Sequence, residues 1–441
     1  MIIGNGRLIS NDPLEPYIEN GGVLIDGNTI RAVGDFQTLK GQFPHEAVYD
    51  VRGRLIMPGM INAHTHIYSA FARGFGPSKP TPNFLKILEN MWWHLDKELT
   101  EEDNRYSAYA AMSESIRLGV TTLIDHHASP HAVPGSLFTL AEAAKDLGIR
   151  ASLCYETSDR DGVEIARQGI AENVRFIKYC GEDKTDMIKG LFGLHASFTL
   201  SDQTLLECRE AMAGLDSGFH IHVAEGTDDE DDAVKNHGMR VVVERLNQFD
   251  ILGPKTIAVH CVHANEAELE IIKATDTTVV HNPESNMGNA VGYSPVVRML
   301  DKGIRVGLGT DAYTNDMFES LKVAKILQSH ALGDPTVGFS HALKLQFDNN
   351  PRILQNYFNQ PLGVLKAGAY ADLIVLEYDP VTPLNDKTMG GHILFGMAGY
   401  QVEDSMINGR FVMKDRVILT VDHAKIMAET RRLSQKLWDR L

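Results

Sequence analysis

Two histidines separated by one residue, His64 and His66, form the pattern with the clearest chemistry in this chain. They follow a Pro58-Gly59 break and close an apolar stretch that is typical of a β-strand. Side chains two residues apart on a strand point to the same face, so both imidazoles can reach one ion. Neutral imidazole is a common ligand of zinc and iron. The pair therefore predicts two ligands of a metal site.

Three later residues extend this site. His222 follows His220 on a second apolar stretch, and Glu225 comes just beyond it. We predict His222 as the third ligand and a packed role for His220. Asp311 follows a glycine-rich strand end and is predicted as the fourth ligand. The alternative for Asp311 is a helix N-cap near Asn315.

Such a ligand set leaves a coordination position open, as catalytic metal sites require. The ion would lower the pKa of bound water toward ~7 and make hydroxide available near neutral pH. We predict that Asp311 also accepts a proton and that Glu225 carries a proton to the substrate. His260 would hydrogen-bond the bound water or the developing oxyanion. His263 fits a structural role as well as a functional one.

The middle of the chain must bring these residues together. Short apolar runs alternate there with helical stretches such as 102–118, 137–147 and 163–180, which is typical of parallel βαβ units. Eight strand candidates suggest an α/β fold with a (β/α)₈ TIM-type barrel, and such barrels bind ligands at the C-terminal ends of their strands. The candidates are residues 61–67, 120–126, 151–155, 190–195, 219–223, 256–262, 277–281 and 306–309.

Both ends of the chain have a different pattern. Gly27-Asn28 and Asn408-Gly409 are turn signals of two β-hairpins, and strand candidates occur at 51–57 and 371–376. These segments form either two separate β-caps or one small sheet domain built from both ends. We divide the chain into residues 1–57 plus 361–441, with a C-terminal helix, and a barrel domain of residues 58–360.

Composition limits the partners. The 441 residues carry a formal net charge of −16, which argues against nucleic-acid and anionic-membrane partners. No stretch is apolar for long enough to span a bilayer. Residues 1–11 lack a signal-peptide pattern, and the four scattered cysteines fit reduced thiols. We expect a cytoplasmic protein with a small-molecule substrate.

These residues carry a resemblance. The chain resembles the amidohydrolase superfamily in its cytosine deaminase, guanine deaminase and chlorohydrolase branch, and within it the SsnA aminohydrolases. The similarity covers nearly the whole chain. The matching stretches are residues 57–66, 119–122, 193–197, 222–225, 259–263, 281–286 and 309–312.

The resemblance implies a barrel with a small β-sandwich domain from both termini, and a homodimer or larger homo-oligomer. It implies one divalent metal ion, usually Zn²⁺ and sometimes Fe²⁺. Relatives with two metals carry a carboxylated lysine at the end of strand four, where this chain has His195, and Lys189 lies at the wrong end of that strand. By resemblance, His195 contacts the substrate and Asn286 lies near it.

Three segments keep more than one interpretation. His126 and His127 either line the substrate pocket or lie behind it. Residues 77–93, with Phe84, Trp92 and Trp93, either form a lid or pack a helix on the barrel. The acidic run at 228–232 fits a helix start better than a second metal site. Residues 424–441 fit a surface helix.

Three functions remain open on the sequence. The first is hydrolytic deamination of a small nitrogen heterocycle by metal-bound hydroxide. The second is opening of a cyclic amide, or hydrolysis of another C–N or C–Cl bond, at the same site. The third is a barrel that binds without turnover, which we weigh lowest because every predicted ligand is present.

Overall fold

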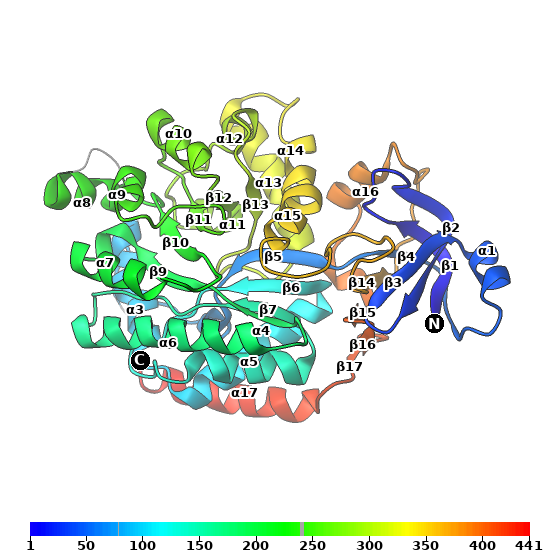
Figure 1. Ribbon diagram of the computed structural model, residues 1–441, viewed down its shortest axis with the longest axis horizontal. Helices are drawn as coiled ribbons and strands as arrows, with labels where there is room; N and C mark the ends of the chain where they lie inside the picture. The colour runs from blue at the N-terminus through cyan, green and yellow to red at the C-terminus, as the bar shows by residue number, and fades with distance from the viewer. Residues whose placement is uncertain (78, 239–241) are drawn as a thin grey trace.

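The structure is a computed structural model that describes residues 1–77, 79–238 and 242–441. Figure 1 shows a larger part built of strands and helices, with a smaller β-rich part beside it. The N-terminus lies in the smaller part, whereas the C-terminus lies against the larger one. The chain therefore crosses between the two parts near both of its ends.

Two parallel sheets form the centre of the larger part. One has the order β5 (Met60–Thr65), β6 (Val120–Asp125), β7 (Arg150–Leu153) and β8 (Ile188–Gly190). The other has the order β13 (Val306–Leu308), β12 (Thr278–His281), β11 (Ile257–His260), β10 (Phe219–Val223) and β9 (Phe192–Ala196). Each of the eight predicted stretches contains a strand, and their side chains are almost all buried.

The fourth predicted strand differs from the prediction, because it is divided at Leu191 into β8 and β9. The Leu191 N–H donates to the Leu153 carbonyl on one side, and the Phe192 N–H donates to the Gly218 carbonyl on the other. The chain thus changes its bonding partner at this point. An isolated parallel bridge between Thr157 and Leu194 continues the contact from the β7 segment to β9.

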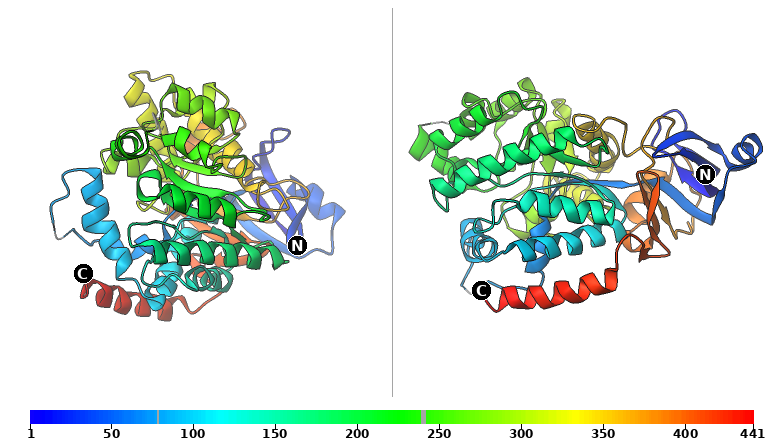
Figure 2. Two further views of the ribbon diagram at one scale, coloured as in Figure 1. Left: turned by 60° about the vertical axis from the view of Figure 1, so that its left-hand side comes forward. Right: turned by 60° about the horizontal axis from the view of Figure 1, so that its bottom comes forward.

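Helices cover the outside of both sheets (Figures 1 and 2). The predicted helices at 102–118, 137–147 and 163–180 are present as α4 (Glu101–Arg117), α5 (Ser136–Leu147) and α6 (Val163–Glu182). Helix α4 begins at a capping box of Thr100 and Asp103. The other helices of this part are η1 (Ile67–Ala72), α2 (Phe84–Ile87), η2 (Leu88–Trp92), α3 (Trp93–Lys97), η3 (Ser197–Thr199), α7 (Asp202–Ala211), α8 (Thr227–His237), α9 (Val242–Gln248), α10 (Glu266–Ala274), α11 (Pro283–Gly288), α12 (Val296–Asp301), α13 (Met317–Leu332), α14 (Phe339–Lys344), η4 (Leu345–Asn349) and α15 (Asn350–Leu354).

The smaller part is one eight-stranded, mostly antiparallel sheet made from both chain ends. Its order is β17 (Val417–Ile418), β16 (Arg410–Lys414), β15 (Val402–Ile407), β14 (Leu373–Leu376), β4 (Val48–Pro58), β1 (Ile2–Ile9), β2 (Tyr17–Asp26) and β3 (Thr29–Asp35). β14 pairs with β4, so a late segment joins an early one in a single sheet rather than in two caps. Both predicted hairpins are present. Short helices α1 (Phe36–Gln42), α16 (Met389–Phe395) and η5 (Gly399–Gln401) flank the sheet.

Gly59 joins the two parts. β4 ends at Pro58 and β5 begins at Met60, so the chain passes directly from one sheet to the other. A Cβ atom at Gly59 would lie 2.1 Å from the Thr121 hydroxyl, which leaves no room for a side chain. The placement of a domain boundary between residues 57 and 58 stays a prediction.

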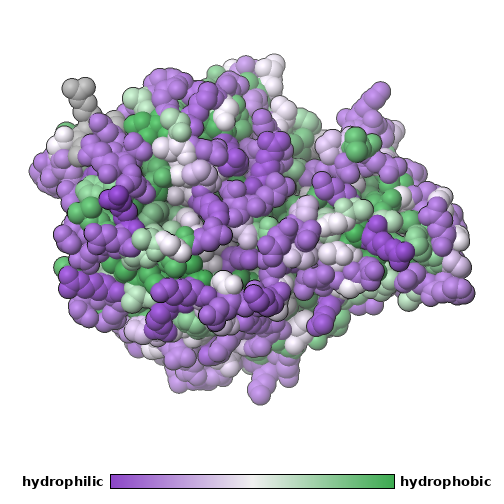
Figure 3. Space-filling view, in the orientation of Figure 1, coloured by the Kyte–Doolittle hydropathy of each residue, from purple (hydrophilic) through white to green (hydrophobic). Residues whose placement is uncertain are grey.

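The C-terminal helix α17 (His423–Trp438) lies along the outside of the larger part (Figure 2). Leu433 and Leu437 are buried there with Phe71, and the Trp438 indole donates to the Phe71 carbonyl at 2.7 Å. The face in Figure 3 is mostly hydrophilic. Among the helices of the described residues, none has the length and apolar character needed to cross a membrane.

Candidate metal centre and active site

The structure brings the four predicted ligands together at the C-terminal ends of β5, β10 and β13. Nε2 of His66 lies 3.2 Å from Nε2 of His222 and 3.1 Å from Oδ1 of Asp311. Nε2 of His64 lies 3.6 Å from the same Asp311 oxygen. Donor atoms of the three histidines all lie within 4.8 Å of one another. These are residues from three distant parts of the chain.

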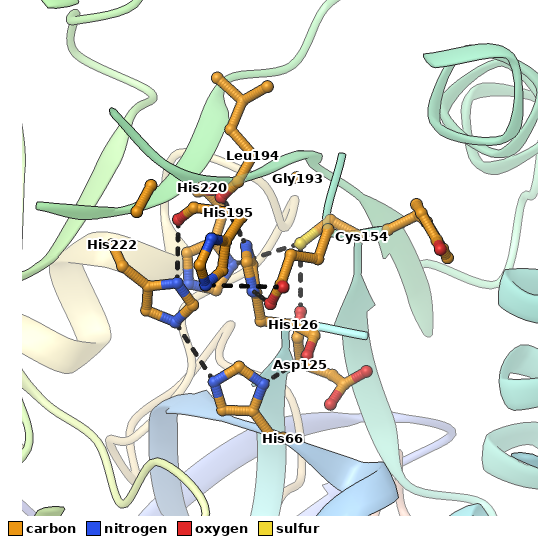
Figure 4. Close-up of polar contacts among 12 residues, drawn as sticks. His66, Asp125, His126, Cys154, Gly193, Leu194, His195, His220 and His222 are labelled. Carbon is orange, nitrogen blue, oxygen red and sulfur yellow. Dashed lines mark hydrogen bonds and ion pairs between the residues drawn. The ribbon is translucent and has the colours of Figure 1, made fainter. Parts of the chain in front are cut away.

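The remaining ring nitrogens are tied to the protein, so the Nε2 atoms can face a common point. Nδ1 of His66 donates to the His126 carbonyl at 2.7 Å, and Nδ1 of His222 donates to the His195 carbonyl at 2.9 Å. Their Nε2 atoms are then the lone-pair nitrogens. Figure 4 shows the rings of His66 and His222 turned toward each other. Nε2 of His64 is buried without a hydrogen-bond partner. A buried nitrogen of this kind, beside a carboxylate, fits a divalent cation.

His220 lies one layer deeper, as predicted for a packed residue. It is fully buried, and its Nε2 lies 2.9 Å from Nδ1 of His64. Its other nitrogen lies 3.5 Å from the Cys154 sulfur. His220 therefore holds the ring of His64 in place.

His260 lies between two carboxylates. Its Nε2 is 3.3 Å from Oε2 of Glu225 and 3.9 Å from Oδ2 of Asp311. The Asn286 amide contacts Nδ1 of His260 at 2.8 Å and donates to it, so the ring hydrogen lies on Nε2 and points to the carboxylates. Asn286 is fully buried behind His260 and does not line the cavity described below. Its predicted place near the substrate stays a prediction.

The two carboxyl groups have pKa values that are shifted in opposite directions. Burial and the nearby charge of Asp311 raise the pKa of Glu225 well above its usual value. Burial also favours a raised pKa at Asp311, but the adjacent imidazoles of His64 and His66 outweigh it and hold the pKa well below the usual value. Paired acids with such opposed shifts are typical of acid–base catalysis.

The site opens into two adjoining cavities. The first has a volume of about 60 Å³ and is lined by Glu156, His195, Glu225 and a group of aromatic side chains, namely Tyr68, Phe84, Trp92, Trp93, Phe198 and Tyr313. The second, of about 340 Å³, shares His66, Trp92 and Asp311 with the first. The ligands thus lie at the junction of a small aromatic cavity and a larger one.

The segment 77–93 forms part of the wall of the first cavity. Phe84, Trp92 and Trp93 come from α2, η2 and α3 and face it. The Arg160 guanidinium lies over the Trp93 ring at 5.3 Å and holds that ring beside His195. This placement favours the lid interpretation over simple packing on a barrel helix. Residue 78 lies outside the described residues.

His126 and His127 do not line either cavity. Nε2 of His126 faces the carbonyls of Leu194 and His220 at 3.1 Å each, and Nδ1 faces Glu156 at 3.2 Å. His127 contacts the Ser129 hydroxyl at 2.9 Å. The structure therefore favours the interpretation in which both lie behind the pocket.

The acidic run at 228–232 forms the first turns of α8, as predicted. Asp229 accepts hydrogen bonds from the backbone N–H groups of Ala224 and Phe198, and burial raises its pKa to about 7. Asp228 and Asp229 also line the first cavity. This side of the cavity presents carboxyl groups, which disfavours anionic substrates.

Sequence reasoning missed four residues at this site: Glu156, Ser285, Asn289 and Tyr313. Ser285 donates to Asp311, and the Asn289 amide contacts Glu225 at 3.4 Å. Glu156 directly follows the predicted strand 151–155, which was the one strand end without an assigned polar residue. The rule that ligands gather at strand ends would have found it.

Three residues near the ends of the parallel strands have left-handed backbone. The φ angles are 47° at Ala224, 71° at His260 and 53° at Asp311, each just beyond or at a strand end. Non-glycine residues are uncommon in this region, and strained backbone of this kind gathers at functional sites. Of the three, Asp311 lines both cavities.

Comparison with known proteins identifies the family to which this chain belongs. Residues 55–412 match the amidohydrolase family. The chain belongs to this family. Two curated amidohydrolase relatives align over nearly their full length. The 5'-deoxyadenosine deaminase of Methanosarcina barkeri is 30% identical over 451 aligned residues, covering 100% of this chain and 99% of the relative. The 5-methylthioadenosine/S-adenosylhomocysteine deaminase of Syntrophomonas wolfei is 31% identical over 448, covering 99% of each.

Solved structures share the amidohydrolase fold. An adenosine deaminase from Xanthomonas campestris with bound zinc has a TM-score of 0.87 at 23% identity, covering 99% of this chain and 98% of that one. The atrazine chlorohydrolase of Arthrobacter aurescens in complex with zinc has a TM-score of 0.80 at 23% identity, covering 98% and 99%. At these identities the likeness shows the α/β fold alone.

Proposed function

We propose that this amidohydrolase removes the amino group of a nitrogen heterocycle by hydrolysis. The observation that carries the proposal is the meeting of three imidazoles and one aspartate beside Glu225, a carboxyl group whose pKa burial raises. The deaminase names of the full-length relatives support the same reaction.

His64, His66, His222 and Asp311 would hold one divalent metal ion. We infer zinc before iron, because two structural neighbours contain zinc. When bound, such an ion lowers the pKa of water toward ~7 and so supplies the nucleophile at neutral pH. A single ion agrees with the absence of a lysine at the end of β9, where His195 stands.

Three residues would then handle protons and charge. Asp311, which lies 3.1 Å from Nε2 of His66, would accept a proton from the attacking water. Glu225, with its high pKa, gives a proton to a ring nitrogen or to the departing amino group. The Nε2–H of His260 lies beside both groups and donates to the developing oxyanion. His195 lines the cavity and contacts the ring.

We also infer that the two parallel sheets close into a (β/α)₈ barrel. The parallel bridges Thr65–Asp311 and Thr157–Leu194 lie at the two seams between them. The N–H groups of Thr310 and Asp311 both donate to the His64 carbonyl, which supports closure beside the ligands. The sandwich form of the small domain, a cytoplasmic location and a homodimer stay predictions, and light scattering on purified protein would test the last.

The substrate class follows from the relatives and the cavity. Aromatic side chains and few cations line the first cavity, which suits a flat, uncharged ring. The relatives are named for adenosine derivatives, so purine nucleosides are the first class to assay. The substrate partner is therefore a small heterocycle.

The test is an ammonia-release screen with aminated heterocycles on protein of measured metal content. We expect ammonia with the ring absorbance retained and one equivalent of metal per chain. Loss of ring absorbance without ammonia would mean ring opening, chloride release would mean dehalogenation, and no turnover with full metal would mean a binding protein. His66→Ala should lose both metal and turnover, whereas the exposed His131→Ala should keep both.

A further inference from the structure

Glu156 is a buried carboxylate that the proposed reaction does not use. It follows β7 and lines the first cavity, yet its side chain is only 4% exposed. Oε2 lies 3.2 Å from Nδ1 of His126. Oε1 faces Nε2 of His195 at 3.8 Å, which is too long for a hydrogen bond. One carboxylate oxygen is thus held in place while the other is turned to the cavity.

The facing nitrogen of His195 is also an acceptor. The Thr199 hydroxyl donates its only hydrogen to the Ala196 carbonyl at 3.1 Å, so it accepts from Nδ1 of His195 at 2.7 Å. A neutral imidazole with its hydrogen on Nδ1 presents a lone pair at Nε2. Glu156 and His195 therefore place two acceptors side by side on the cavity wall.

Neither acceptor receives a hydrogen bond from the described part of the protein, and both residues line the first cavity. A ligand that brings an N–H or amino group to this point would satisfy both. We name this pair, Glu156 Oε1 and His195 Nε2, the acceptor pair. It selects for hydrogen-bond donors on whatever occupies the cavity.

The position of the acceptor pair shows which part of a ligand it meets. Side-chain atoms of Glu156, His195 and His222 that could bind a metal lie within 4.8 Å of one another. The same holds for Glu156, His66 and His126. The pair therefore borders the metal centre, where the reacting ring must lie. A distant substituent such as a sugar would lie farther out, toward the larger cavity.

Given the proposed deamination, on which this inference rests, we propose that the acceptor pair recognises a ring amino or N–H group in addition to the leaving amino group. The substrate is then a diamino- or amidine-bearing ring, such as a 2-aminopurine derivative. An adenine ring joined to a sugar carries no donor besides its leaving group. Its other edges are lone-pair nitrogens or C–H, which leave the acceptor pair unsatisfied.

Adenosine and 2,6-diaminopurine riboside form a matched pair of substrates, because they differ only in the 2-amino group. We expect kcat/KM to favour the diamino compound by about 10- to 100-fold, the range for a hydrogen bond to a charged group. Glu156→Gln removes the negative charge from the acceptor pair, which weakens it as an acceptor whichever way the amide is turned. The preference should fall at least tenfold or reverse.

A binding measurement separates this inference from the proposed function. Purine riboside and 2-aminopurine riboside carry no leaving amino group, so calorimetry reports their affinities without turnover. We expect tighter binding of the 2-amino compound to the wild type and no such preference in Glu156→Gln. If the enzyme turns over heterocycles but binds both probes equally well, the acceptor pair is wrong and deamination stands. If the 2-amino probe binds more tightly but no ring is turned over, the acceptor pair stands and deamination is wrong.

Controls cover folding and the sugar. Glu172→Gln changes a buried glutamate on α6 that accepts from the backbone of Gly135 and Leu137, so it should keep the wild-type preference. Both variants should keep the wild-type metal content. If Glu156→Gln instead abolished discrimination between adenosine and 2'-deoxyadenosine, the donor would be a sugar hydroxyl and the ring assignment would be wrong. Absence of binding by both probes would also contradict it.

Discussion

At the scale of single residues, the site separates two carboxyl groups by their surroundings. Glu225 is buried near a negative charge, whereas Asp311 lies beside the imidazoles of His64 and His66. His260 lies between them with its ring hydrogen fixed by Asn286. The pKa values of the two carboxyl groups are thus shifted apart.

Replacement of Glu225 by glutamine tests the proton role. Glu225→Gln keeps the shape of the side chain but cannot transfer a proton, so we expect kcat to fall by about 10²- to 10⁴-fold. Metal content, measured by mass spectrometry, should not change. The control Glu230→Gln alters a half-buried acid on α8 that does not line the cavity, and should keep activity. Full turnover in Glu225→Gln would remove the residue from the mechanism.

Glu284 gives a pH prediction outside the ligand set. Burial raises its pKa from 4.5 to about 7, and no cation pairs with it among the described residues. A folded-state pKa above the unfolded value means that the free energy of unfolding falls as the pH rises from 4.5 to 7, and stays lowered above 7. Glu284→Gln should therefore stabilise the protein by about 2 kcal/mol at pH 8 and by almost nothing at pH 4.5. Urea unfolding at both values measures this, and an equal effect at both would contradict it.

Residue types and spacing predicted most of this site, but not which side chains lie behind others. The sequence predicted the four ligands because strand periodicity and strand ends determine where such side chains point. These are His64, His66, His222 and Asp311. Asn286 was placed near the substrate by resemblance. The structure places it behind His260, because α11 turns its side chain under that ring. Side-chain direction on a short helix after a strand depends on tertiary packing.

At the scale of elements, a buried amide lies at one seam between the parallel sheets. Asn173 on α6 is fully buried and bonds the backbone N–H and carbonyl of Tyr155, and also the carbonyl of Gly193. A Cβ at Gly193 would lie 2.3 Å from the Tyr155 carbonyl, so the two segments approach closely there. The amide joins the segment that carries Glu156 to β9.

Loss of that amide should weaken the seam. Asn173→Ala leaves several buried backbone groups without partners, so we expect the free energy of unfolding to fall by about 3 kcal/mol. Asn236→Ala removes an exposed asparagine on α8 and should change it by less than about 0.5 kcal/mol. Urea unfolding of both variants gives the comparison. Equal stabilities would show that β9 does not depend on this contact.

The eight strand positions and three of the helices were predictable because apolar periodicity is a local property. The break at Leu191 was not, because it depends on which neighbours the chain bonds on either side. The joining of the two end segments into one sheet was left open for the same reason. Pairing between β4 and β14 links residues more than 300 positions apart, and no local pattern specifies it.

At the scale of the whole molecule, a buried ion pair connects the two parts. Arg150 on β7 lies 3.0 Å from Asp372, which leads into β14, and both side chains are at most 1% exposed. The guanidinium also lies over the Tyr370 ring at 4.2 Å and donates to the Asp186 carbonyl. The parallel sheet and the antiparallel sheet therefore share one charged contact.

Removal of this cation should destabilise both parts together. Arg150→Ala leaves the Asp372 charge buried and unpaired, which costs about 3–5 kcal/mol. Arg167→Ala breaks an exposed pair with Glu207 and should cost less than about 1 kcal/mol. Calorimetry should show one transition at lower temperature for Arg150→Ala. A transition that splits, with the larger part unaffected, would show that the two parts unfold independently.

The left-handed backbone at Ala224, His260 and Asp311 has a consequence for how the site is dissected. Aspartate, asparagine and histidine tolerate that conformation better than alanine or any β-branched residue. An alanine scan would therefore confound two losses, that of the functional group and that of local chain geometry. Asp311→Asn and His260→Asn change the functional group while keeping a tolerant residue. Kinetic defects in Asp311→Asn and His260→Asn therefore measure the loss of the functional group. Defects in the alanine variants also contain the cost of a distorted turn.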